Sequence, residues 1–433
     1  MSAVTATVPA GGVPGTLIAS TWSGVRYGAL GFALAFLALP LYVILPSHYA
    51  TQYRVALATL GAVLLATRAL DAVLDPFIGR AVDRVLEHSV RWAWTCAALA
   101  ALVVGTGFTA LFFPQVGEAW TVVWLTASLL PTYLGFSVLS VIHQAWGTRL
   151  GGDREHRARV VAWREGFGLA GVLAASVLPS LFGLGAASTL LALALAVGVV
   201  LLAGAPSVSS VRIQPDRVQT APWALPWHAA PFRRLLAVFM LNGIASAVPA
   251  TLVLFFVRDR LQAQHAEALF LGAYFAAAAV SIPLWLRGVR AFGLARAWLV
   301  GMGLAIAAFV WALMLGTGEI AGFLAVCIAS GVALGADLTI PGAMLTGVVQ
   351  RAGHHASAEG VYVGWWTAAT KLNLGLAAGG TLPLLSLAGY APGRSDEQAL
   401  FVLGLAYVAV PCALKLTAAA MLWRWWIDKE AEE

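Results

Sequence analysis

The sequence predicts an all-α membrane protein with twelve transmembrane helices arranged in two six-helix halves. Of its 433 residues, 60% are hydrophobic and only 11% are charged, and the mean hydropathy is +0.84. Such a composition lies far from that of soluble domains. Apolar stretches of roughly 20 residues, each long enough to cross a bilayer, recur along the whole chain. Short loops rich in Gly, Pro and Arg separate them, which is the pattern that spanning helices require.

The apolar stretches place the expected helices in order. A proline at position 40 predicts a kink in the first helix, because proline removes a backbone donor. The twelve expected helices cover about 25–45, 55–78, 92–113, 120–146, 160–181, 182–204, 235–257, 268–286, 298–315, 320–349, 360–387 and 400–426.

One long polar segment, 205–234, divides these helices into two groups of six and contains five prolines. We therefore expect a flexible tail at 1–23, a first half at 24–204, a linker at 205–234, a second half at 235–426 and a tail at 427–433. Each half has a basic loop after its second helix, GRAVDR in one and RGVRAFG in the other. This weak repetition favours two parallel repeats.

Arginines concentrate in alternate loops, and this asymmetry predicts the orientation of the chain. By the positive-inside rule both termini are cytoplasmic, in a multi-pass protein of a bacterial-type inner (plasma) membrane. The net charge of +6 then reflects topology, and we expect no nucleic-acid partner. The N-terminus has neither a basic region nor a cleavage site, so we expect no removable signal peptide. Cys96, Cys327 and Cys412 fall inside expected helices and are interpreted as packing residues.

The stretch from Leu65 to Arg84 carries charge into the second expected helix. Arg68, Asp71 and Asp75 follow one another at spacings of three and four, which places them on one helical face. A charged group at bilayer depth costs at least ~2.5 kcal/mol, so this face points into the bundle or a watery cavity. Two interpretations follow. The charges form an internal ion pair that locks helices together, or they form a cation site.

The acid pair favours the cation site. Two carboxylates one turn apart repel each other, and in a poorly hydrated cavity this raises the affinity of at least one for a proton or a small cation. Oxygen ligands suit hard cations. Pro76 leaves a backbone carbonyl near Ala72 without its usual donor, which adds a further candidate ligand. After it, Gly79 predicts a tight turn that places Asp83 and Arg84 at the membrane edge.

Other polar side chains in expected helices are candidates for a solute site, and each has an equally ordinary role between helices. Lys371 is interpreted as the only lysine deep in a span, where a buried ammonium needs a carboxylate partner. The pair Arg164 and Glu165 fits either an interfacial position or the cavity. The remaining candidates are Asp337, Asn242, Asn373, Tyr362, His143, Gln144 and the adjacent Trp365 and Trp366, one of which is expected to face lipid.

Three motifs resemble one known family. They are R-A-L-D-A-V-L-D-P-F-I-G-R-A-V-D-R at 68–84, D-R-E-H-R at 153–157, and E-G-V-Y-V-G-W-W-T-A-A-T-K at 359–371 with G-Y-A-P-G at 389–393. The chain resembles the glycoside-pentoside-hexuronide:cation symporters, the melibiose permease family within the major facilitator superfamily. The motifs lie in both halves, so the resemblance covers nearly the whole chain and implies the major facilitator fold.

The resemblance implies roles for individual residues. Asp71 and Asp75 match the two acids that contribute to the family's sodium, lithium or proton site. Lys371 matches a lysine near that site, and Thr367 a threonine beside it. Arg164 matches an arginine at the family's sugar site.

The sequence also departs from the family pattern. Sodium-using members often have Asn where this chain has Leu74, which favours protons over sodium. The acid that binds sugar on the first helix is absent, since Leu34 and Ala35 occupy that region. Ser137 or Ser140 stands where the acid of the fourth helix is expected. Without these acceptors the strongest grip on sugar hydroxyls is lost, which argues against a galactoside.

From these observations we expect a cation-coupled secondary active symporter that moves a small solute, first of all a sugar or glycoside, by alternating access. The cation site would consist of Asp71, Asp75, Thr367 and Lys371. The solute contacts would be Arg68, Arg164, Ser137, Ser140, Asp337, Asn242, Trp365 and Asn373. The coupling ion is H⁺ or Na⁺, and no other cofactor is expected. We expect a monomer whose partners are the solute and membrane lipid.

Two alternatives remain beside this expectation. The same fold can carry a lysolipid or another amphipathic solute, which the apolar first helix favours. An enzyme or a sensor is a different class. The chain has no H-E-x-x-H, G-x-S-x-G or P-loop sequence, so we expect no enzymatic activity. The His354 and His355 doublet is interpreted as a solvated loop feature, and the tail DKEAEE is too short for a sensor's output domain.

Overall fold

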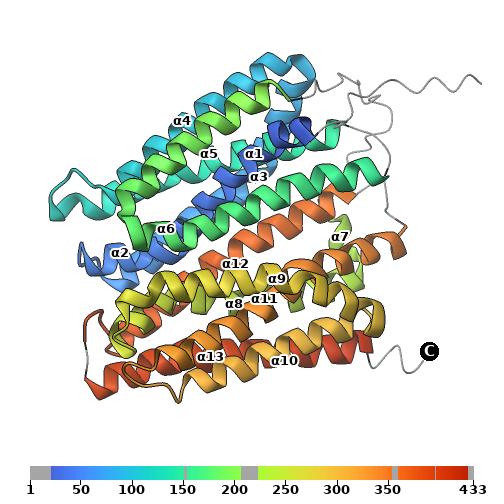
Figure 1. Ribbon diagram of the computed structural model, residues 1–433. Helices are drawn as coiled ribbons and strands as arrows, with labels where there is room; N and C mark the ends of the chain where they lie inside the picture. The colour runs from blue at the N-terminus through green and yellow to red at the C-terminus, as the bar shows by residue number, and fades with distance from the viewer. Residues whose placement is uncertain (1–20, 151–153, 206–222, 354–358, 395, 428–433) are drawn as a thin grey trace, which may run out of the picture.

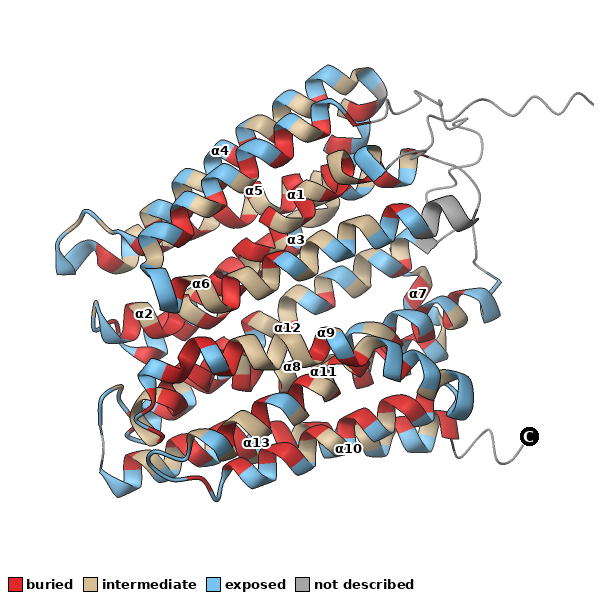
Figure 2. Ribbon diagram, in the orientation of Figure 1, coloured by how far each residue is buried: buried red, intermediate tan, exposed pale blue. Residues whose placement is uncertain are grey.

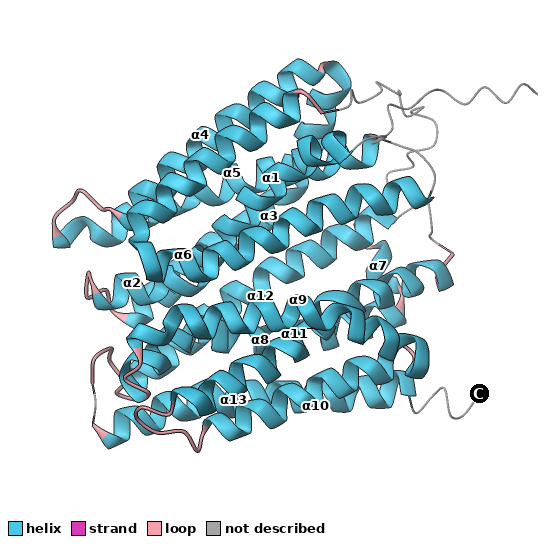
Figure 3. Cartoon of the chain, viewed as in Figure 1, coloured by secondary structure: helices cyan, strands magenta, loops and turns pink. Residues whose placement is uncertain are grey.

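The computed structural model of the protein describes residues 21–150, 154–205, 223–353, 359–394 and 396–427. Within these ranges the chain is helical, with loops only at the ends of the bundle and no strand (Figure 3). The helices run side by side along one direction (Figure 1). The first and last described residues lie at the same end of the bundle, which we call the terminal end.

We call α1 to α6 the first half. Its elements are α1 (Thr21–Leu39), the π-helical turn η1 (Pro40–Ile44), α2 (Leu45–Thr51), α3 (Leu57–His88), α4 (Val90–Phe112), η2 (Glu118–Trp120), α5 (Thr121–Arg149) and α6 (Arg154–Ala203).

The second half begins after the linker. Its elements are α7 (Leu225–His228), α8 (Ala230–Phe255), η4 (Phe256–Arg260), η5 (Gln264–Ala266), α9 (Glu267–Phe292), α10 (Leu294–Ala312), α11 (Ile320–Arg351), α12 (Glu359–Leu387), α13 (Glu397–Leu422) and η6 (Trp423–Ile427).

Ten helical segments of the described residues are long and apolar enough to cross a membrane. One of them, within α6, is interrupted at Gly183, where the backbone is not helical (φ 81°, ψ 168°). Dividing α6 there and adding the 29-residue α12, which carries Lys371, gives the twelve expected passes. The all-α membrane fold is therefore confirmed, and the count of twelve depends on these two steps.

Helix α3 differs from the expectation. It continues to His88, so Gly79 lies inside a helix and the expected tight turn does not exist. Gly79 is not among the glycines with positive φ. Pro76 is accommodated within the same helix, because a single missing donor interrupts only one backbone hydrogen bond. At the end of the helix, Asp83 accepts a 3.3 Å hydrogen bond from Arg149.

Other helix boundaries also shift. Helix α1 begins at Thr21, inside the expected tail, α6 begins at Arg154, and α8 begins at Ala230, inside the expected linker. Polar first turns extend these helices beyond the apolar stretch, which is the only part that hydrophobicity marks. The expected disturbance at Pro40 is present as the π-helical turn η1 between α1 and α2.

Each half is held together by pairs of packed helices, and two further pairs join the halves. In the first half α1 packs on α6 and α4 on α5, and in the second half α11 packs on α9 and α10, and α13 on α8. Between the halves, α3 packs on α12 and α6 on α9. Buried residues alternate with exposed ones along the helices (Figure 2). Large apolar side chains are among the exposed ones, for example Leu102, Val280 and Leu387, as expected of surfaces that face lipid.

The two halves also meet at the end opposite the terminal end. There Arg258 of η4 forms a bidentate ion pair with Glu267 at 2.6 and 3.1 Å. Its remaining nitrogen donates a 3.1 Å hydrogen bond to Ser47 of the first half. Nearby, Gly61 of α3 lies against Pro383 of α12. These contacts close one end of the interface between the halves.

Glycine packing in α11 supplies a test of the fold. A Cβ at Gly331 would collide with the backbone oxygen of Tyr274 in α9, whereas a Cβ at Gly342 in the same helix meets no atom within 4 Å. Gly331→Ala should therefore lower the free energy of unfolding by about 1 to 3 kcal/mol through overpacking. Gly342→Ala should be neutral or slightly stabilising. Thermal melts of the two purified variants in detergent compare them, and equal melting temperatures would contradict this packing.

Candidate cation-binding site

Four polar side chains from three helices meet between the two halves. Asp71 and Asp75 come from α3, Ser137 from α5 and Lys371 from α12. The Lys371 ammonium donates to Asp75 Oδ1 and to Ser137 Oγ, both at 2.6 Å, and lies 3.0 Å from Asp71 Oδ2. Ser137 in turn donates a 2.7 Å hydrogen bond to Asp71 Oδ1. One ammonium of the second half is thus shared by two carboxylates of the first half.

Burial differs among these groups. The Asp71 side chain is fully buried, while those of Asp75 and Lys371 retain 16% and 13% exposure. The pair therefore does not point into lipid, and it can be reached from solvent on the side of Asp75. A buried ion pair of this kind is stable only when its geometry and additional hydrogen bonds compensate for desolvation.

Two carboxylate oxygens of the site lack a hydrogen bond. Asp71 Oδ2 and Asp75 Oδ2 are buried and have no hydrogen-bond partner among the described residues. An unsatisfied buried acceptor costs about 1–3 kcal/mol, and more when it is charged. Asp75 Oδ2 can therefore accept a proton or a small cation directly, whereas Asp71 Oδ2 lies 3.0 Å from the Lys371 ammonium and can do so only when Lys371 moves away.

Arg68 lies one turn before Asp71 on the same helix. Its guanidinium carbon is 3.8 Å from the centre of the Tyr133 ring, and its Nη1 is 3.7 Å from Asp71 Oδ2. The Arg68 side chain is only 8% exposed. The three groups that the sequence placed on one face of this helix are therefore brought together in the structure.

A second buried ion pair lies wholly within the second half. Asp337 of α11 accepts hydrogen bonds from Asn242, Trp298, Ser246 and Lys415, at 2.9, 2.9, 3.2 and 2.9 Å. Lys415 of α13 also donates a 2.7 Å hydrogen bond to Asn242 Oδ1. Every oxygen of this carboxylate is satisfied, so the cluster is closed by its own members.

Lys415 corrects the interpretation of Lys371 as the only lysine deep in a span. It is 3% exposed and sits in the middle of α13. The signal was present in the sequence as a lone lysine in the apolar run C-A-L-K-L-T, residues 412–417. The same rule that singled out Lys371, that an intramembrane ammonium needs a carboxylate, applies to Lys415, and the structure identifies Asp337 as that carboxylate.

Four further candidates, all within the described residues, form no hydrogen bond or ion pair with the acid pair: Arg164, Ser140 and Asn373, expected as solute contacts, and Thr367, expected at the cation site. Arg164 forms a 2.6 Å ion pair with its neighbour Glu165. Asn373 is buried against Gly243 of α8, and its Oδ1 has no hydrogen-bond partner among the described residues. Ser140 is half-buried, and Thr367, one turn before Lys371, is exposed.

The aromatic and histidine candidates pack between helices. Trp365 donates a 3.0 Å hydrogen bond to the backbone oxygen of Trp223, and Trp366 stacks on Phe239 with ring centres 3.8 Å apart. His143 is bonded to the backbone oxygen of Tyr27 at 2.8 Å. Residue 153 of the D-R-E-H-R motif and the doublet His354 and His355 lie outside the described residues.

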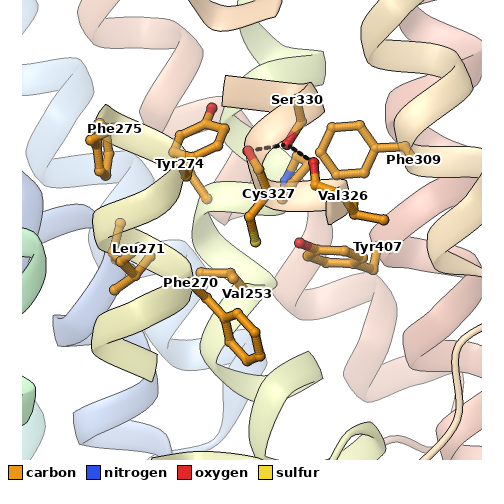
Figure 4. A pocket seen from close by; sticks show the side chains of 13 residues that line it. Val253, Phe270, Leu271, Tyr274, Phe275, Phe309, Val326, Cys327, Ser330 and Tyr407 are labelled. Carbon is orange, nitrogen blue, oxygen red and sulfur yellow. Dashed lines mark hydrogen bonds between the residues drawn. The ribbon is translucent and has the colours of Figure 1, made fainter. Parts of the chain in front are cut away.

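A separate cavity lies between helices of the second half, with Val43 of η1 from the first half in its lining (Figure 4). The other aromatic and aliphatic side chains that line it come from α8, α9, α10, α11 and α13, and none of the lining side chains is charged. Its one serine, Ser330, donates to the backbone oxygens of Val326 and Cys327 in its own helix, at 2.7 and 3.3 Å. The Cys327 thiol and the Tyr407 hydroxyl point toward each other across it. Lacking charge, this cavity does not compete with the acid pair as a cation site.

The described helices form a multi-pass membrane bundle with an ion pair buried between its two halves. A family described as "MFS/sugar transport protein" matches residues 26–429, so the chain belongs to this family. This confirms the family resemblance found in the sequence. No curated protein sequence matches the chain.

Solved structures share the fold at low sequence identity. The nucleoside transporter NupG is 16% identical, with a TM-score of 0.69 over 92% of this chain and 98% of its own. A bacterial homologue of the human lysosomal transporter Spinster, in an inward-facing conformation, is 14% identical, with a TM-score of 0.65 over 94% and 97%. A bacterial homologue of the iron transporter ferroportin is 17% identical, with a TM-score of 0.63 over 92% and 98%.

The shared ammonium leads to a stability test. Lys371→Ala leaves the two carboxylates with only the more distant Arg68 guanidinium as a counter-charge, and should lower the free energy of unfolding by about 3–5 kcal/mol. Adding Asp75→Asn removes one of the two charges and should restore part of the loss, which a double-mutant cycle on thermal melts in detergent measures.

The closed cluster provides the matched control for this cycle. Adding Asp75→Asn to Lys415→Ala, which removes the other buried ammonium, should restore nothing. Strictly additive effects of Lys371→Ala and Asp75→Asn would show that the two groups do not interact.

Proposed function

We propose that the protein is a cation-coupled secondary active symporter of a small solute. The observation that carries this proposal is the shared ammonium: Lys371 of α12 contacts both Asp71 and Asp75 of α3, and the buried Asp75 Oδ2 has no hydrogen-bond partner among the described residues. A fully satisfied ion pair would only join helices. This one has an acceptor left for an incoming cation.

Cation binding and the contact between halves are linked through Lys371. A proton or sodium ion at the acid pair competes with the ammonium, because both are stabilised by the same carboxylates. Displacing Lys371 weakens one contact between α3 and α12, which belong to different halves. The ligand-free and loaded states then differ in their preferred arrangement of the halves, as alternating access requires.

We favour the proton as the coupling ion. Sodium needs several oxygen ligands, and Asp71, Asp75 and Ser137 supply few, while Leu74 adds none. Among the described residues no group of three or more His, Cys, Asp or Glu side chains gathers to hold a metal ion. A proton needs only one carboxylate oxygen.

For the solute we favour a sugar or glycoside, which the family description supports. The alternative is an amphipathic solute such as a lysolipid, which the apolar α1 supports. We further propose a monomer in a bacterial-type inner membrane with both termini in the cytoplasm, as the arginine distribution indicates.

Removing the Asp75 carboxylate distinguishes cation-coupled accumulation of the solute from simple exchange of the solute across the membrane. In proteoliposomes, Asp75→Asn should lower solute accumulation driven by a proton or sodium gradient at least tenfold, because the carboxylate that exchanges Lys371 for the cation is lost. Exchange of labelled for unlabelled solute, which needs no net cation movement, should persist.

The assay uses the radiolabelled sugar, glycoside or lysolipid that most raises the melting temperature of the purified protein. Glu118→Gln, at an exposed position in η2, is the control and should behave as the unaltered protein. Gradient-driven accumulation that survives in Asp75→Asn would refute the coupling role of this site.

A further inference from the structure

The Arg68 guanidinium is buried beside the acid pair but forms no short hydrogen bond with either acid. Its side chain is 8% exposed, and its closest carboxylate oxygen, Asp71 Oδ2, is 3.7 Å away. Charge-assisted hydrogen bonds between nitrogen and a carboxylate are usually about 2.7–2.9 Å long. Asp71 is instead bonded to Ser137 at 2.7 Å and approached by Lys371 at 3.0 Å. The acid that lies closest to Arg68 is therefore committed to other groups.

Other arginines of this protein make short contacts with their acceptors. Arg258 holds Glu267 at 2.6 and 3.1 Å, Arg164 holds Glu165 at 2.6 Å, and Arg260 donates to backbone oxygens at 2.8 and 3.1 Å. Each of them is more exposed to solvent or nearer the end of the bundle than Arg68. Arg68 is therefore more buried than Arg164 and Arg258, yet its contact with a carboxylate is longer than theirs.

Tyr133 holds Arg68 in a defined plane. The guanidinium carbon lies 3.8 Å from the centre of the Tyr133 ring, a cation–π contact that occupies one flat face. The five N–H donors of a guanidinium lie in its plane, and a contact between the guanidinium carbon and a ring does not itself occupy them. A planar fork held in this way matches the two oxygens of a carboxylate or a phosphate.

The charge balance of the site also favours a negatively charged solute. Arg68 and Lys371 carry two positive charges, and Asp71 and Asp75 carry two negative ones, so the site without a coupling ion is neutral. The Asp337 and Lys415 cluster is also neutral. Loading one cation gives the site a net charge of +1, which is costly away from water. A negatively charged solute removes this cost, and a neutral solute does not.

We propose that Arg68 binds an anionic group of the solute, a carboxylate or a phosphate, through its in-plane N–H donors, with Tyr133 as the positioning residue. The inference rests on the proposed cation coupling and narrows its solute class to an anionic one. It implies that one cation accompanies each negative charge, so that a monovalent anion crosses with no net movement of charge.

Binding measurements test the role of Arg68 directly. The probes are gluconate, glucose 6-phosphate and uncharged sorbitol, added to the purified protein in thermal-shift titrations at a fixed concentration of coupling ion. At least one anion should raise the melting temperature in a saturable manner, and sorbitol should not. The comparison of gluconate with glucose 6-phosphate separates a carboxylate from a phosphate preference.

Variants assign the effect to the guanidinium. Arg68→Gln should weaken anion binding at least tenfold, and Arg68→Lys, which keeps the charge and loses the fork, should weaken it less. Tyr133→Leu, which keeps all four charges of the site, should also weaken anion binding. It replaces Arg68→Gln as the test if that variant does not fold. Arg296→Gln, at an exposed position in α10, is the control and should bind as the unaltered protein. Equal binding of sorbitol and anions, no shift with either anion, or unchanged affinity in Arg68→Gln overturns the proposal.

Asp75→Asn distinguishes this inference from the proposed coupling. It gives the site a charge of +1 without a cation, so anion binding should persist and should no longer increase with the coupling ion. Uptake of a monovalent anion by the unaltered protein in proteoliposomes should not respond to a potassium diffusion potential set with valinomycin. If uptake ignores ion gradients but anion binding still requires Arg68, the coupling fails and the anion site stands. If gradients drive uptake of sorbitol and Arg68→Gln has no effect, the anion site fails alone.

Discussion

One ammonium shared between two carboxylates is the interaction on which the rest of this structure depends. Lys371 belongs to the second half, and Asp71 and Asp75 belong to the first, so the electrostatic contact is also a contact between the halves. In surroundings of low dielectric such a contact is strong, and leaving any member unpaired is expensive. The helices around it must therefore hold Lys371 near the acids, or supply another cation when it leaves.

The two buried ion pairs of the protein show how similar groups differ in what they can do. Asp337 receives four hydrogen bonds from its own half, and its partner Lys415 is 3% exposed. That cluster joins α8, α10, α11 and α13 into one unit. At the other pair, two oxygens lack hydrogen bonds and solvent reaches Asp75. The unsatisfied acceptors, more than the presence of charge, mark the pair suited to exchange its partner.

The contacts between the halves are unevenly distributed along the bundle. Arg258 bonds to Ser47, and Gly61 lies against Pro383, both at the end away from the termini. Around Gly79, nearer the terminal end of α3, a Cβ would meet no neighbouring atom within 4 Å. The acid pair lies between these regions on α3. A change at Lys371 therefore acts at a distance from the tight contacts at the end opposite the termini.

The sequence alone determined the all-helical membrane fold, the face shared by Arg68, Asp71 and Asp75, and the need of Lys371 for a carboxylate, because hydrophobicity, helical period and the cost of buried charge are local or general properties. It placed the end of α3 ten residues too early, since apolarity marks the membrane and not the helix. Only the tertiary structure decided that Ser137 joins the acids, that Lys415 pairs with Asp337, and that Arg164 and Trp365 bond to other partners. Those outcomes depend on how each helix is rotated and which helix it packs against, and the rotation results from contacts between residues far apart in the chain.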